Sequence, residues 1–161
     1  MGTLNLSSTA SLTPSVVEGP AFYVARDQSQ SISDTTWTKI DLFTTNSGGF
    51  DTNSCWDNSN SRFTPNVPGY YQIQFILAIS SGSLRAGRAA IYKNGSRWAM
   101  TEMYMDPNEA YDDFCTTVAS MIYLDGDTDY VEFYSWRNGG NGGVGGASDV
   151  CQATGFLARQ A

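Results

Sequence analysis

The sequence predicts an all-β domain, and three observations carry that prediction. Only 16% of the 161 residues are charged, while 16 Gly, 9 Tyr and 8 Phe favour short strands joined by glycine turns over amphipathic helices. Residues 70–79 alternate with the period of two expected of a strand. Asn94-Gly95 lies between two apolar segments and predicts a tight hairpin. The chain length suits one folded domain.

Residues 1–20 differ from the rest of the chain and are interpreted as an extended N-terminal arm, with residues 21–161 as the folded domain. They are rich in Ser and Thr, carry Glu18 as their one charge, and end in Gly19-Pro20. Four apolar side chains could anchor the arm: Leu4, Leu6, Leu12 and Val16. The arm could add to the sheet edge of a neighbour or fold back on its own domain.

Two of the predicted strands are apolar on both faces. In residues 70–79 this holds from Phe75 onward. In residues 116–124, one side carries Val118, Ile122 and Leu124, and the other carries Ala119, Met121 and Tyr123. A strand of this kind needs cover on its second face, which in a small domain comes from another subunit. The pattern therefore predicts an oligomer.

Turn signals place the later elements. Asn94-Gly95 satisfies the positive φ angles of a type I′ turn, and Asp125-Gly126-Asp127 separates the strand ending at Leu124 from the one at 130–136. A glycine-rich loop is expected over 138–146, and a last strand over 151–158.

The composition argues against catalysis, nucleic-acid binding and membrane insertion. Histidine is absent, which removes the usual general base and the Ser-His and Cys-His pairs. A net charge of −7 disfavours phosphate binding, and no segment reaches the ~20 apolar residues of a membrane helix. The acidic stretch Glu102, Asp106, Glu109, Asp112 and Asp113 could hold a glycosidase pair, but we interpret it as a solvated loop. We expect no enzyme activity and no cofactor.

Two smaller groups of residues leave alternatives open. Asp125, Asp127 and Asp129 alternate like calcium ligands, although the glycine position and Trp136 do not fit an EF-hand. A turn without metal is favoured over a looser calcium site. The three cysteines, Cys55, Cys115 and Cys151, cannot all pair. We expect them reduced and mostly buried, with one bridge and one leftover thiol as the alternative.

Trp136, Arg137 and Asn138 form an aromatic strand end that leads into the glycine-rich loop. An aromatic ring in such a place could stack on the face of a sugar, which would make these residues a glycan-binding loop. Alternatively, the loop only connects two strands, and this plainer interpretation is favoured.

The order of short segments along the chain resembles a known module. These segments are Ala21-Phe22, Trp37 to Ile40, Phe50-Asp51, Arg62 to Pro65, Pro68 to Tyr71, Tyr92 to Gly95, Leu124, Gly126-Asp127, Tyr130-Val131 and Thr154 to Leu157. Over residues 21–161 the chain is similar to the globular head of complement component one q, which shares its jelly roll with tumour necrosis factor. The resemblance implies a two-sheet jelly-roll β-sandwich of about ten antiparallel strands that trimerises about a threefold axis. The trimer-interface residues it implies are Tyr70, Gln72, Ile76, Ala119, Met121, Tyr123 and Phe156.

The sequences of three segments resemble those in the versions of this module found in bacteriophage virion proteins: Trp37-Thr38-Lys39, Tyr92 to Gly95, and Asp129 to Val131. This resemblance implies a virion structural protein on the outer capsid surface, assembled in the bacterial host cytoplasm. One role is a trimeric capsid decoration (cement) protein whose arm grips the major capsid protein. The other is the receptor-binding tip of a tail fibre or tailspike, which would bind a host surface glycan. Because no shaft precedes the domain, the cement role is expected.

Overall fold

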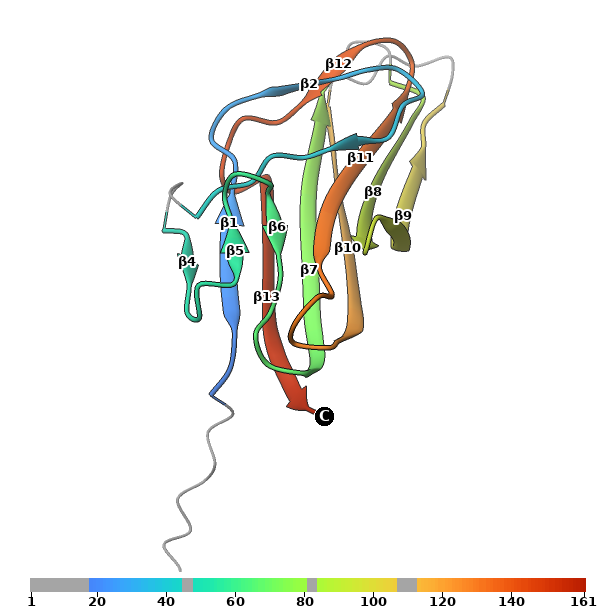
Figure 1. The fold of residues 1–161 in the computed structure, drawn as a ribbon. Coiled ribbons are helices and arrows are strands. Elements are labelled where there is room, and N and C mark those ends of the chain that lie inside the picture. The colour runs from blue at the N-terminus through green and yellow to red at the C-terminus, as the bar shows by residue number, and fades with distance from the viewer. Residues whose placement is uncertain (1–17, 45–47, 81–83, 107–112) are drawn as a thin grey trace, which may run out of the picture.

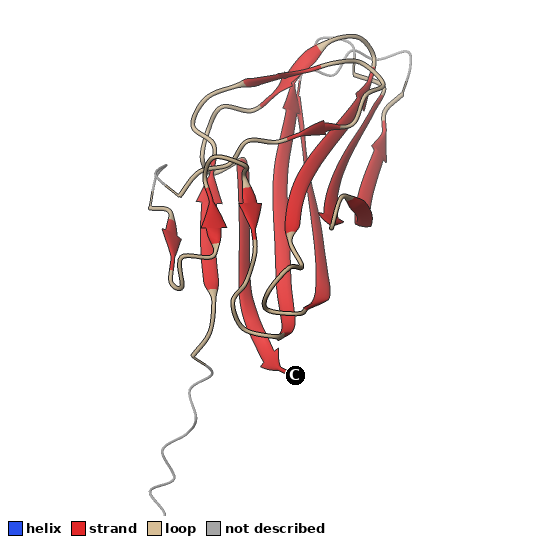
Figure 2. Ribbon diagram, viewed as in Figure 1, coloured by secondary structure: helices blue, strands red, loops and turns tan. Residues whose placement is uncertain are grey.

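Two antiparallel β-sheets lie face to face in the computed structural model, which describes residues 18–44, 48–80, 84–106 and 113–161 (Figure 1). Within these ranges there is no helix, so every regular element is a strand (Figure 2). The all-β class and the two-sheet arrangement are thus confirmed. The described ranges form thirteen strands, against about ten expected, because several are pairings of only two or three residues.

The first sheet, called sheet A, is built around the longest strands. Its order is β2 (Gln30–Ile32), β12 (Gly142–Val144), β7 (Gly69–Ser80), β13 (Cys151–Gln160), β1 (Ala21–Ala25) and β4 (Phe50–Asp51), and β10 (Asp113–Leu124) pairs with the other side of β7. β7 and β10 pair along their full length, from Gly69 opposite Leu124 to Ser80 opposite Asp113. β10 is therefore an edge strand of sheet A.

The second sheet, called sheet B, covers one face of sheet A. Its order is β5 (Trp56–Asp57), β6 (Arg62–Phe63), β11 (Val131–Asn138), β8 (Ala86–Lys93) and β9 (Ser96–Tyr104), and β3 (Thr38–Lys39) also pairs with β11. The core between the sheets is rich in aromatic rings. Phe75 of β7 lies 5.0 Å from Phe133 of β11, and Phe22 of β1 lies 4.5 Å from Phe63 of β6, between ring centroids. All four side chains are buried, and burying rings of this size dominates the energetics of such a core.

Both predicted turns are present. Asn94 and Gly95 have φ angles of 50° and 74°, as a type I′ turn requires. The second turn closes on Asp125, whose carboxylate accepts the backbone N–H groups of Asp127, Thr128 and Asp129 at 2.8–3.0 Å. The glycine-rich segment 138–146 is not the plain loop expected, since β12 forms within it and pairs with β2 and β7.

The arm and the C-terminus enter and leave the sandwich at the same end. The backbone N–H of Leu157 donates to the Pro20 carbonyl at 2.9 Å, and the N–H of Ala161 donates to the Pro68 carbonyl. We call this the terminal end; β2 and β12 lie at the opposite end, the far end (Figure 1). Residues 1–17, with Leu4, Leu6, Leu12 and Val16, lie outside the described residues.

Candidate functional site

The outward face of sheet A, which points away from sheet B, carries all of the predicted interface residues. Alternate residues of β7 and β10 point outward, and the register places them opposite one another: Tyr70 with Tyr123, Gln72 with Met121, Gln74 with Ala119, and Ile76 with Thr117. Phe156 of β13 lies on the other side of Gln72. The structure thus brings all seven predicted residues onto three adjacent strands.

The half of this face nearest the terminal end is apolar and exposed. Tyr70, Met121, Tyr123 and Phe156 keep 45%, 47%, 40% and 52% of their surface accessible. The rings of Tyr70 and Tyr123 are 5.5 Å apart, and Met121 and Phe156 lie on either side of Gln72 on the same face. We call these four residues the apolar patch. Contiguous exposed apolar surface of this kind marks an interaction site more often than chance exposure does.

The centre of the face is polar. A hollow of about 200 Å³ is lined by Gln74, Ile76, Gln152 and Thr154. Toward the far end, Cys115 stands opposite Ala78 and is exposed. The expectation of buried thiols is therefore wrong for this one cysteine. Cys55 and Cys151 are buried, and all three thiols are free. Burial raises the pKa of Cys151 to about 12.

Sequence reasoning missed several exposed apolar side chains. Tyr23 of β1 and Phe50 of β4 stack at 6.4 Å between ring centroids and extend the outward face of sheet A to its other edge. β9 exposes Trp98, Met100, Met103 and Tyr104. The alternation of Tyr23 with buried Phe22 and Val24 could have indicated the first pair. β9 has no regular alternation, so no periodic signal identifies its exposed side chains.

The proposed glycan-binding loop is not a single surface. Trp136 lies on the outer face of sheet B under the guanidinium of Arg88, 3.9 Å from its ring centroid. Arg137 points the other way and is fully buried, donating from Nη1 to the Ser80 carbonyl at 3.0 Å. Desolvation lowers the pKa of this guanidinium. The backbone carbonyl of Asn138 accepts a hydrogen bond from the backbone N–H of Arg85. Arg137 therefore cannot reach a surface sugar in this arrangement.

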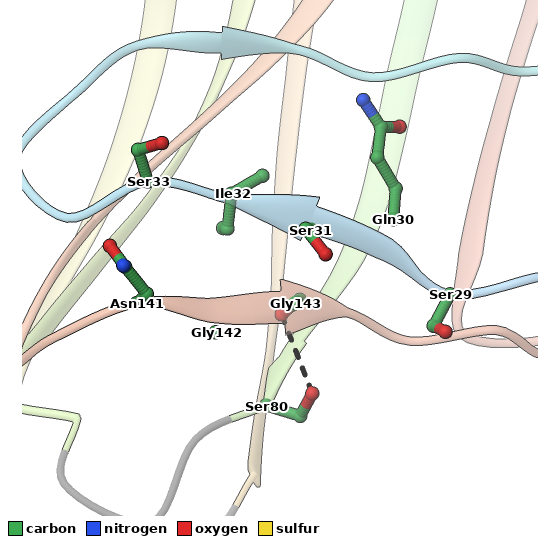
Figure 3. Close-up of a pocket in the computed structure, with 9 residues that line it drawn as sticks. All are labelled: Ser29, Gln30, Ser31, Ile32, Ser33, Ser80, Asn141, Gly142 and Gly143. Atoms are coloured by element: carbon green, nitrogen blue, oxygen red, sulfur yellow. Dashed lines mark hydrogen bonds between the residues drawn. The ribbon is translucent and has the colours of Figure 1, made fainter.

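The far end carries an open polar hollow of about 600 Å³ (Figure 3). Its lining is uncharged: Ser29, Gln30, Ser31, Ile32, Ser33, Ser80, Asn141, Gly142 and Gly143. Ser80 points toward the β12 backbone and donates to the Gly143 carbonyl at 3.4 Å. Hydroxyl groups of this kind can hydrogen-bond a neutral polar molecule, but they offer no acid, base or nucleophile pair.

Several of the acidic side chains are engaged within turns and ion pairs. Hydrogen bonds to Asp125, led by the N–H of Asp129, lower its pKa. Asp129 lies 2.8 Å from Lys93 Nζ and accepts from Asn94 at 2.6 Å. Glu102 pairs with Arg88, whereas Glu109 and Asp112 lie outside the described residues. Across the described ranges, no three metal-ligating side chains come together.

A search of the described residues finds no helix with the length and apolar character needed to cross a membrane.

Comparison with known proteins relates the chain to others by fold alone. No family model matches the sequence, and no curated protein matches it. Among solved structures, Eiger, a tumour necrosis factor from S. frugiperda, superposes with a TM-score of 0.67 at 8% identity, covering 89% of this chain and 96% of that one. Murine APRIL at pH 5.0 gives a TM-score of 0.64 at 7% identity, covering 86% and 98%. The predicted jelly-roll β-sandwich of the tumour necrosis factor type is therefore confirmed.

Proposed function

We propose that this protein is a non-catalytic assembly module whose copies associate as a homotrimer through the outward face of sheet A. The observation that carries the proposal is the apolar patch, four large side chains that are 40–52% exposed on adjacent strands. The threefold stoichiometry rests on the resemblance to complement component one q heads and on the jelly-roll fold.

The size of the patch supports a stable contact. With a side chain of this class presenting about 200 Å² when fully accessible, the four residues expose roughly 350–400 Å². Covering that area is worth about 9 kcal/mol per copy at ~25 cal/mol/Å². This gain must offset the entropy lost on association, which costs on the order of 4–15 kcal/mol. The remaining contact area on β1, β4 and β13 would add to it.

Two matched substitutions test the interface. Met121→Arg places a charge in the apolar patch, whereas Met100→Arg places it at a similarly exposed position opposite Ala90, on the outer face of sheet B. Native mass spectrometry should find trimers for the wild type and for Met100→Arg, and monomers for Met121→Arg. A monomeric wild type at 10 μM or above, or a trimeric Met121→Arg variant, would refute the proposal.

We further propose that the trimer is a bacteriophage capsid decoration protein held by its arm. The supporting observations are the phage-like segments, in particular Trp37-Thr38-Lys39, and the location of Pro20, the last residue of the arm, at the terminal end. Removing residues 1–17 spares Pro20 and its bond to Leu157. The truncated protein should remain a soluble trimer and no longer bind phage shells that lack it. Shell binding at wild-type strength would contradict this role.

The second candidate is a host-binding tip, and one observation favours it. The hollow at the far end is lined by hydroxyl and amide groups that suit the hydroxyls of a sugar. In this role the isolated trimer adsorbs to host cells and competes with infection, and it is present in few copies per virion. Densitometry of purified particles separates the two roles, because a decoration protein is present in hundreds of copies.

A further inference from the structure

A group of polar side chains interrupts the face that the proposed trimer would bury. Gln72 and Gln74 lie on β7 between Tyr70 and Ile76, with Gln72 half-buried and Gln74 exposed. Gln152 and Thr154 of β13 stand directly opposite Ile76 and Gln74. We call Gln72, Gln74, Gln152 and Thr154 the polar island. Its centre is the hollow of about 200 Å³.

The amides of the polar island are largely without partners in the single chain. The side chains of Gln72 and Gln74 make no hydrogen bond to any other described residue, and Gln152 makes one, from Nε2 to the Asp149 carbonyl at 3.3 Å. Each glutamine amide offers two donors and an oxygen with two lone pairs. Water satisfies these groups on an exposed face. Once the face is covered, every group left unpaired costs free energy.

The need to pair the buried amides favours some arrangements of two copies over others. Apolar contact is non-directional, so the apolar patch alone permits several registers and copy numbers. Amide hydrogen bonds form only when donor and acceptor meet at about 2.7–3.2 Å with suitable angles. A single polar residue in an apolar interface is known to fix register and oligomeric state at a cost in stability.

We infer that Gln72 and Gln74 determine the specificity of self-association, by hydrogen bonding to the polar island of a neighbouring copy directly or through water held in the hollow. The hollow has room for several water molecules at ~30 Å³ each. The inference rests on the proposed trimer and identifies which of its interface residues determine the register in which the copies associate. The partner is a second copy of this chain. The apolar patch provides the binding affinity, and the polar island determines the register and the number of copies.

The test replaces both amides by side chains of similar size without hydrogen-bonding groups. The double variant Gln72→Leu, Gln74→Leu is compared with wild type and with Gln28→Leu, which changes an exposed glutamine before β2. Native mass spectrometry over a dilution series gives stoichiometry and dissociation concentration, and circular dichroism checks the fold. The double variant should populate dimers or tetramers beside trimers, whereas wild type should form trimers alone. Gln28→Leu should behave as wild type.

The outcomes separate the two proposals. A double variant that remains exclusively trimeric, at any dissociation concentration, overturns the inference and leaves the proposed trimer standing. A mixture of stoichiometries that Gln28→Leu shares equally also overturns it, because the effect would then not belong to the island. A wild type that is monomeric throughout the series removes the proposed function and the inference together.

Discussion

Replacing Glu132 by glutamine tests how an ion-pair network holds the outer face of sheet B. Glu132 of β11 is 3% exposed. Its Oε1 accepts from Arg62 Nε at 3.1 Å and Nη2 at 2.8 Å and lies 3.4 Å from Lys39 Nζ. Its Oε2 accepts from the Tyr134 hydroxyl at 3.3 Å. One carboxylate therefore links β11 to β6 and β3, which are strands of only two residues.

The expected loss can be worked from burial. Removing one partner of a fully buried ion pair costs about 3–5 kcal/mol. Here the Arg62 and Lys39 side chains keep 34% and 31% exposure, so water recovers part of their solvation, and glutamine retains one acceptor oxygen. We expect a loss of about 2 kcal/mol, which for a domain of this size lowers the melting temperature by about 4–8 °C.

The assay is urea unfolding followed by tryptophan fluorescence at one fixed protein concentration, because association makes the midpoint concentration-dependent. The matched control is Glu102→Gln, which removes the carboxylate beside Arg88 on the same face, where both side chains are 23% exposed. That pair should be worth less than about 1 kcal/mol. A Glu132→Gln variant within 0.5 kcal/mol of wild type, or no less stable than Glu102→Gln, would refute the reasoning.

Three further predictions concern a thiol, a carboxylate and a glycine. Peptide mapping after maleimide labelling should find Cys115 modified at least tenfold faster in the Met121→Arg variant than in the wild-type trimer, while Cys151 stays unlabelled in both; equal rates would show that the assembly leaves Cys115 uncovered. Asp125→Asn should lower the melting temperature by several degrees above pH 5. Hydrogen bonds depress the pKa of Asp125 in the folded state. The stability that its carboxylate contributes is therefore complete above the unfolded pKa of about 4 and is lost as pH falls through the folded pKa. The difference in melting temperature between wild type and Asp125→Asn should narrow below pH 4, and a constant difference would contradict this. Gly126→Ala should cost about 2 kcal/mol or more in urea unfolding, since φ is 77° and a Cβ would overlap the Pro68 nitrogen. In Gly95→Ala, φ is 74° but the Cβ would make only an ordinary contact, with the Tyr130 hydroxyl at 3.6 Å, so the loss should be about 1 kcal/mol. Equal losses would show that the contact with Pro68 does not matter.

The elements that could be predicted from the sequence are those in which local pattern and tertiary environment agree. Residues 70–79 alternate because one face of β7 packs on sheet B, and the burial pattern follows that alternation as far as Ile76, beyond which residues 77–79 are all buried. Asn-Gly strongly favours the positive φ angles of a type I′ turn, which Asn94 and Gly95 adopt here, so local sequence was enough to predict the hairpin. The location of Met121 and Phe156 on one face, in contrast, depends on β13 pairing with β7, which local pattern could not indicate. The resemblance implied only that both residues lie at the trimer interface.

Other features escaped prediction for physical reasons. Arg137 continues the inward alternation of Val131, Phe133 and Ser135, but a charged side chain is rarely buried fully, so the sequence suggested an exposed loop. Its burial is possible because Gly142 of β12 has no Cβ, whose position would overlap Arg137 Nη1. That contact joins residues of different sheets and has no signature in either segment alone.

Pro20 and the C-terminus lie at the same end of the folded domain, and this determines how the domain responds to mechanical load. A pull applied between the two ends peels β1 from β13 and breaks their hydrogen bonds one after another, starting beside Pro20 and Leu157. A pull between the arm and the far end instead runs along β1, across the direction of its hydrogen bonds. The five paired positions from Ala21 opposite Phe156 to Ala25 opposite Gln152 then share the load. A trimer tethered by its arms and pulled from the far end would therefore resist in the stronger, shearing geometry.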